Sequence, residues 1–337
     1  MRNLLSALCS ISAVSGREEV LRDYILSEVK DYAECKVDRS GNLICFKKGL
    51  KPADRKIMVD AHMDEVGIIA TAITSDGFVK FSTVGGILPA VMLGRRVVFE
   101  NGIIGVVGVK PVHLASAEEK KKYPEEDSLY IDIGADSKED AEKLIALGDT
   151  AVFDGDFRDL GGSTLISRAI DDRAGVAVLI KLLKEQSEHD FYATFTVQEE
   201  VGCRGAKTAA FSLAPDGAIV LEATTAADLH GVDEDKRVCV LGNGPAVSFM
   251  DRSTLYDRKL YSAAISCGVK CQTKAAVAGG NNSGAIHLSR AGIPTIAISA
   301  PCRYIHSPSC VADIKDIEGM YTLAKEMLSK MASGEVL

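Results

Sequence analysis

Six side chains that bind metals or transfer protons recur along the chain, each in a segment with its own local pattern. They are His62, Asp171, Glu199, Glu200, Glu222 and His306. Five of the six could hold two divalent cations, which leaves one carboxylate to activate a water molecule. The set therefore indicates metal-assisted hydrolysis, and a peptide bond is the substrate that we expect.

Most of these residues follow apolar runs that predict buried strands. The runs are Lys56–Asp60 before His62, Phe191–Val197 before Glu199 and Glu200, Ala218–Leu221 before Glu222, and Thr295–Ser299 before His306. In an open α/β sheet, functional residues gather at the carboxyl ends of the strands. The sequence therefore predicts that these distant segments converge. Each segment alone has an ordinary explanation as a strand end or a solvated loop.

The histidine and aspartate segments suggest further roles. Asp64 lies two residues after His62 and could orient the imidazole through its other ring nitrogen. Asp171 and Asp172 are adjacent carboxylates where a loop enters a helix, and one carboxylate with two oxygens can bridge two cations. We assign that bridge to Asp171. The competing explanation is an ordinary helix N-terminus, where acidic residues favour the helix dipole.

The pair Glu199 and Glu200 ends an apolar strand and precedes Gly202. Neighbouring side chains in extended chain point in opposite directions. Two adjacent carboxylates can therefore divide the work, and we assign Glu200 to metal binding and Glu199 to general base and acid catalysis. A pair of solvated loop glutamates is the alternative. Zinc is the expected metal, and cobalt and manganese accept the same nitrogen and oxygen ligands.

Composition excludes several classes of protein. The chain has 337 residues, 47% of them hydrophobic, and a net charge of −8, which argues against nucleic acid as a partner. Nine cysteines without a CxxC pair favour reduced thiols and a cytoplasmic location. No apolar stretch is long enough to span a membrane.

Residues Leu4–Ile11, after Met1 and Arg2, could form a short signal-peptide core, but helical spacing favours a folded start. Leu4, Leu5, Leu8 and Ile11 recur with helical period. Ser15–Glu18 then has the pattern of a capping box that opens an amphipathic helix through Val29.

The overall pattern predicts an α/β fold in two parts. Residues 1–67 and 163–337 should form a three-layer α/β/α catalytic domain with a mixed, mostly parallel sheet. Residues 68–162 contain short β-prone runs separated by glycine turns, which predicts an inserted small β-barrel-like domain. The expected later helices are Asp172–Leu183, Ala206–Ser212, Leu255–Gly268, Ala285–Ala291 and Ile314–Met331.

Four segments together resemble the tetrahedral, or TET-type, aminopeptidases, a family of dinuclear metallopeptidases that includes glutamyl and deblocking aminopeptidases. They are Ala61–Gly67, Ile170–Gly175, Gln198–Gly202 and Arg303–Ser307. Gly94–Val97, Lys110–Leu114 and Ala291–Thr295 are similar too, so the resemblance covers nearly the whole chain.

The resemblance implies a metal pair bridged by Asp171, with His62 and Glu222 on one metal and Glu200 and His306 on the other. It also implies that the insertion mediates dimerisation and that six dimers form a hollow dodecamer. Peptide substrates would enter such a particle and folded proteins would not.

Two positions depart from the family pattern. Glu222 stands where the family commonly has aspartate, which could alter metal spacing. Gly279–Asn282 stands where the family has Gly-Gly-Thr-Asp, so a carboxylate is replaced by Asn282. We expect a metal-dependent aminopeptidase acting on short peptides. The alternatives are a dinuclear-metal carboxypeptidase or deacylase and a catalytically weakened assembly subunit; a metal-free glycosidase is disfavoured, because the carboxylates are committed to cations.

Overall fold

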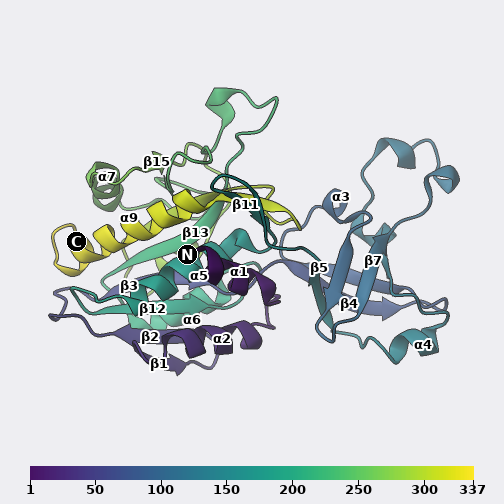
Figure 1. Cartoon of the computed structure of the whole chain (residues 1–337), viewed down its shortest axis with the longest axis horizontal. Coiled ribbons are helices and arrows are strands. Elements are labelled where there is room, and N and C mark those ends of the chain that lie inside the picture. Colours follow the sequence, from purple (N-terminus) through teal and green to yellow (C-terminus); the bar gives the residue numbers. More distant parts are fainter.

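The computed structural model describes residues 1–337, with the side chain of Glu119 excepted. It contains a large mixed sheet covered by helices and, beside it, a separate closed β-barrel (Figure 1). Along the large sheet the strand order is β1 (Glu34–Val37), β2 (Leu43–Lys47), β12 (Phe191–Thr196), β3 (Ile57–His62), β13 (Gly217–Thr225), β16 (Thr295–Arg303), β17 (Cys310–Asp313), β11 (Thr164–Ser167) and β10 (Arg158–Gly161).

The centre of this sheet is parallel and its flanks are antiparallel. β12, β3, β13 and β16 pair in parallel, in that order. The flanking pairs β1–β2, β2–β12, β16–β17, β11–β17 and β10–β11 are antiparallel. Two short strands, β14 (Ala246–Val247) and β15 (Gln272–Thr273), extend the sheet beside β16. The predicted mixed α/β architecture is confirmed.

Alternating side chains of the central strands make two separate cores, one on each face. In β13, Ile219 and Leu221 join the larger core and Ala218 and Val220 join the smaller one. The larger core includes α1 (Arg2–Ser10), α2 (Glu19–Val29), α5 (Ile170–Lys184), α7 (Arg258–Ser266) and α9 (Ile314–Ala332). The smaller core includes α6 (Arg204–Leu213) and α8 (Ser283–Ile286). The sheet is therefore the middle layer of three.

The barrel is formed by six antiparallel strands with a core of their own. Their order is β4 (Gly67–Ile73), β5 (Val79–Val84), β8 (Tyr130–Asp132), β7 (Ile104–Gly108), β6 (Arg96–Phe99) and β9 (Thr150–Phe153), with the short helices α3 (Pro89–Met92) and α4 (Lys138–Glu142) beside them. β10, which the sequence-based boundary at residue 162 includes in the insertion, pairs with β11 of the large sheet. The division into two domains stays a prediction.

Three local expectations differ from the structure. α7 begins at Arg258 because the Asp257 side chain accepts the backbone N–H groups of two residues in its first turn. α8 is a single turn, shorter than the helix expected over residues 285–291. The prediction of a capping box before α2 is wrong, because Glu18 is itself the N-cap residue and makes no side-chain cap hydrogen bond. No helix among the described residues is long and apolar enough to cross a membrane.

Candidate metal centre

The carboxyl ends of the central parallel strands meet at one edge of the large sheet, and the expected site residues lie along it. His62 is the last residue of β3 and pairs in register with Thr196, the last residue of β12. Glu199 and Glu200 lie in the turn that follows β12, which ends at Thr196. Glu222 differs from expectation, because β13 continues to Thr225 and the glutamate lies within the strand. Parallel pairing of neighbouring strands thus brings the segments together.

The first imidazole faces two carboxylates. The Nε2 atom of His62 lies 3.1 Å from Oδ1 of Asp171 and 3.3 Å from Oε1 of Glu222. Its Nδ1 lies 3.0 Å from the backbone carbonyl oxygen of Asp64. Because a carbonyl oxygen only accepts, Nδ1 carries the hydrogen of the neutral ring, and Nε2 presents its lone pair to the two carboxylates. These lone pairs repel unless positive charge lies between them.

The second imidazole repeats this arrangement. Nε2 of His306 lies 3.3 Å from Oδ2 of Asp171 and 3.3 Å from Oε1 of Glu200. Its Nδ1 lies 2.8 Å from the carbonyl oxygen of Gly86, in the loop that follows β5 of the barrel. The neutral ring therefore also presents an Nε2 lone pair. Asp171 offers one oxygen to each histidine, as a bridging carboxylate does.

The separations of these atoms fit metal ligation. Nitrogen and oxygen ligands placed about 2.0–2.2 Å from a tetrahedral zinc ion lie about 3.3 Å apart. The buried Oε1 of Glu200 has no hydrogen-bond partner among the described residues, although carboxylate oxygens are normally satisfied. Ligand atoms of His62, Asp171 and Glu200 also lie within 4.8 Å of one another. The donor set of imidazole nitrogens and carboxylate oxygens fits divalent cations.

Electrostatics point the same way. Burial alone would lower the pKa of His306, but Asp171 and Glu200 outweigh it and raise that pKa to about 11. The pKa of His62 is likewise raised, against its burial, by Glu222 and Asp171. Burial raises the pKa of Glu222 well above its ordinary value, and the nearby Asp171 adds to the shift. The cluster has an excess of negative charge that protons or cations must balance.

Asp172 is a second candidate for the aspartate ligand, because one of its oxygens lies within 4.8 Å of donors from His62 and Glu222. Its Oδ1, however, accepts the backbone N–H of Gly175 at 2.8 Å. Asp171 instead directs an oxygen at each histidine. The geometry therefore favours Asp171 as the shared ligand and Asp172 as the residue that fixes the first turn of α5.

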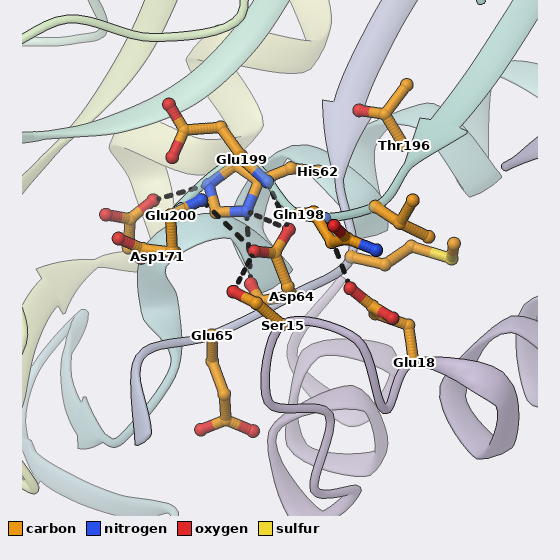
Figure 2. A network of polar contacts seen from close by, with 12 residues as sticks. Ser15, Glu18, His62, Asp64, Glu65, Asp171, Thr196, Gln198, Glu199 and Glu200 are labelled. Atoms are coloured by element: carbon orange, nitrogen blue, oxygen red, sulfur yellow. Dashed lines mark hydrogen bonds and ion pairs between the residues drawn. The ribbon is translucent and has the colours of Figure 1, made fainter. Parts of the chain in front are cut away.

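Glu199 lies near His62 (Figure 2), and it is not among the carboxylates that contact the Nε2 atom of His62 or of His306. Its Oε1 accepts a hydrogen bond from Sγ of Cys203 at 3.5 Å. Burial raises the pKa of Glu199 to about 8, against the opposing effect of His62. Bound cations would lower this value by their charge. Glu199 thus lines the same cleft as Asp171, Glu200, Glu222 and His306.

Asp64 contacts more than the imidazole for which it was expected. The carboxylate Oδ1 of Asp64 lies 3.4 Å from Nδ1 of His62, whereas the backbone carbonyl oxygen of Asp64 lies 3.0 Å from the same nitrogen. The same carboxylate accepts the backbone N–H groups of Glu199 at 2.9 Å and Glu200 at 3.1 Å, and the hydroxyl of Ser15 at 2.6 Å. Figure 2 shows these groups converging on it.

Lys274 lines the same cleft and was missed by sequence reasoning. The cleft has a volume of about 260 Å³ and also contains Asp171, Glu199, Glu200, Glu222 and His306. Lys274 is only 7% exposed, and its Nζ donates to the carbonyl oxygen of Ala278 at 3.1 Å. Among the described residues no carboxylate lies within ion-pair distance of it. A lone lysine in a loop gives no sequence signal of this placement.

Asn282, where the family pattern has a carboxylate, is buried beneath the cleft. Its amide nitrogen donates to Asp60 at 2.8 Å and to Thr196 at 2.9 Å. Asn281, its neighbour, lines the cleft instead. The departure at Asn282 therefore bears on how the loop is attached to the sheet.

The fold and the donor set define a metal-dependent hydrolase. Residues 41–323 match the family described as M42 glutamyl aminopeptidase. A putative aminopeptidase of Acetivibrio thermocellus is 43% identical over 335 residues, covering 97% of this chain and 98% of that protein.

Two solved structures are also similar. One is aminopeptidase APDkam598 from Desulfurococcus kamchatkensis, with a TM-score of 0.94, 36% identity and coverage of 99% and 96% of the two chains. The other is the Pyrococcus horikoshii TET1 peptidase, which can assemble into a tetrahedron or a large octahedral shell. Its TM-score is 0.83, with 35% identity and coverage of 96% and 98%. The chain belongs to the M42 glutamyl aminopeptidase family and is a peptide hydrolase.

Proposed function

We propose that this enzyme removes N-terminal residues from short peptides with the help of two divalent cations. One cation would be held by His62, Asp171 and Glu222, and the other by Asp171, Glu200 and His306. The observation that supports this most strongly is the placement of one Asp171 oxygen near each histidine. Zinc is the expected metal, with cobalt or manganese compatible with the same ligands. Bound cations would supply Lewis-acid stabilisation of developing negative charge and acidify water.

In this proposal Glu199 handles the proton. Its carboxylate lines the cleft and would accept a proton from the attacking water and deliver it to the leaving amine. Asp64 would orient His62 and the backbone of Glu199. These roles need a carboxylate that is not itself a ligand, and Glu199 makes no close contact with either histidine in the described structure.

Replacement of the proposed base tests this role. Glu199→Gln keeps the size of the side chain and removes the proton acceptor, so kcat should fall by about 10²- to 10⁴-fold. Metal content measured by elemental analysis should stay the same, because the five ligands are untouched. Glu139→Gln, on the exposed surface of α4, is the matched control. Undiminished turnover of Glu199→Gln would reject the role.

The cleft also supports a substrate preference. A buried ammonium without a carboxylate partner is costly, and an acidic side chain of the substrate would offset that cost. We therefore propose that Lys274 binds the side chain of an N-terminal glutamate or aspartate.

A panel of fluorogenic aminoacyl substrates tests this preference. Wild-type enzyme should favour glutamyl and aspartyl substrates over leucyl and lysyl ones. Lys274→Met should lower kcat/KM for the acidic substrates by about 10- to 100-fold, because it removes one charged hydrogen bond to the substrate. Lys270→Met, at an exposed lysine nearby, should change none of them. An equal fall for all substrates, or a wild-type preference for lysyl ones, would contradict the proposal.

We further propose that the chain acts as a cytoplasmic homo-oligomer, with the insertion of residues 68–162 joining dimers and six dimers forming a dodecamer. The similarity to a peptidase that assembles into a tetrahedron supports the assembly. The nine cysteines are free thiols in the structure, which supports a reducing compartment.

A further inference from the structure

The turn that carries Glu199 and Glu200 is held through its backbone N–H groups, which donate to two carboxylates. We call residues 198–200 the glutamate turn. Its three successive N–H groups donate to Oε1 of Glu18 at 3.1 Å and to Oδ1 and Oδ2 of Asp64 at 2.9 and 3.1 Å. Gln198 has a φ of 56°, in the left-handed region that non-glycine residues seldom adopt. This conformation needs support from its surroundings.

Much of that support comes from a segment far away in sequence, which we call the N-terminal hook, residues 13–18. The hydroxyl of Ser15 donates to Oδ2 of Asp64 at 2.6 Å. Oε1 of Glu18 accepts the backbone N–H of Gly16 at 2.8 Å as well as that of Gln198. Figure 2 shows Ser15 and Glu18 approaching Asp64 and Gln198 from the same side. The side chains of Ser15 and Glu18, whose spacing in the sequence is that of a capping box, thus bind Asp64 and the glutamate turn instead.

The hook is itself fixed to the segment that carries His62. Ala13 accepts the backbone N–H of Glu65 at 2.9 Å and donates its own N–H to the Glu65 carboxylate at 3.1 Å. Arg173 is fully buried and donates to Glu65 at 3.0 Å and to the carbonyl oxygen of Ile11 at 3.2 Å. The hook therefore has a fixed position relative to the cleft.

The burial of Glu18 is costly. This side chain is 5% exposed, and no cation lies within ion-pair distance of it among the residues that the structure describes. A buried carboxylate without a cationic partner lowers stability unless its hydrogen bonds offset the loss of water. The glutamate at this position is therefore better explained by its hydrogen bond to the glutamate turn than by a contribution to folding stability.

We propose that Ser15 and Glu18 are positioning residues for the peptidase reaction. They hold Asp64 and the glutamate turn so that Glu199 faces the cleft and Glu200 faces His306. This inference rests on the role proposed for Glu199. A misplacement of the reacting groups by about 1 Å can reduce the rate about 100-fold, so the loss of either contact should act on turnover.

Three pairs of variants test the inference in the full-length, metal-loaded enzyme. Ser15→Ala and Glu18→Ala remove the contacts, whereas Ser15→Thr and Glu18→Gln keep a hydroxyl and an acceptor oxygen. Ser10→Ala and Glu19→Ala are matched controls at exposed positions nearby. We expect the first pair to lower kcat about 10- to 100-fold, as the loss of groups that orient metal ligands does, with little change in KM. The second pair should retain most of the activity and the controls all of it.

Hydrogen exchange provides a readout that needs no substrate. The backbone amides of residues 198–200 should exchange faster in Ser15→Ala and Glu18→Ala than in wild type, and at the wild-type rate in the controls. If wild type removes no N-terminal residue while exchange responds as expected, the proposed function fails and the hook contacts stand. Unchanged exchange in both alanine variants would overturn the inference. So would turnover within about two-fold of wild type, or equal losses in the controls.

Discussion

At the scale of residues, main-chain carbonyls decide which nitrogen of each imidazole faces the cleft. Asp64 and Gly86 each accept from an Nδ1 atom, so both Nε2 atoms are directed at carboxylates. A neutral carbonyl fixes the tautomer and the ring orientation without adding a further charge. Neither ring therefore needs a charged group on its Nδ1 side to hold this orientation.

Glu18 gives a prediction about pH. Burial raises the pKa of Glu18 from 4.5 to about 7, against the hydrogen bonds that it accepts. The folded chain therefore binds more protons than the unfolded chain between these values, and stability falls as the pH rises through this window. Glu18→Gln does not titrate. Its free energy of unfolding relative to wild type should therefore be greater at about pH 8 than at about pH 5, with about 1.4 kcal/mol for each unit of pKa shift.

Urea denaturation of the metal-free proteins at both pH values measures this difference. Glu19→Gln, at an exposed neighbouring position, should show no such trend. A stability difference between Glu18→Gln and wild type that is the same at both pH values would show that Glu18 does not titrate in this range.

At the scale of elements, the hydrophobic pattern was sufficient to predict whether a long, buried segment is a strand or a helix. The runs before His62, Glu199 and Glu222 are strands in the structure, and Ile314–Ala332 is the closing helix. These segments have apolar side chains with a clear period, so local sequence determines their type. The predicted small barrel is also confirmed. It could be predicted because glycine turns separate its short strands.

Sequence patterns gave wrong predictions where a side chain binds a residue far away in the chain instead of its local partner. Ser15 and Glu18 have the spacing of a capping box, but their side chains bind Asp64 and the glutamate turn. Lys274 and Gly86 lie in loops whose positions depend on packing between strands far apart in sequence. The convergence of the proposed ligands could be predicted because each has a distinctive local setting, whereas the residues that contact them from other loops have none.

At the scale of the whole molecule, the segment between β7 and β8 of the barrel carries exposed apolar side chains. Three side chains on its long loops are Val112, Leu114 and Tyr123, exposed by 73%, 61% and 82%. Large exposed apolar side chains close together in sequence are typical of contact surfaces. The proposed dimer would cover them.

Charge on these loops should therefore weaken assembly. The double variant Leu114→Glu, Tyr123→Glu should sediment as a smaller species than wild type in analytical ultracentrifugation, with an unchanged circular dichroism spectrum. Leu50→Glu, at an exposed leucine that precedes β3, is the control and should leave the assembly intact. A wild-type chain that sediments as a monomer would contradict the proposed oligomer, and an unaffected double variant would exclude this surface.

The pair of cations is the central claim, and metal stoichiometry tests it most directly. Wild-type protein, His62→Ala, His306→Ala and the variant with both substitutions would each be reconstituted with zinc, separated from free metal and measured by elemental analysis against protein concentration. We predict two ions per chain in wild type, fewer in each single variant and none in the double variant. A wild-type chain that retains no metal, or the same stoichiometry in all four proteins, would contradict the account.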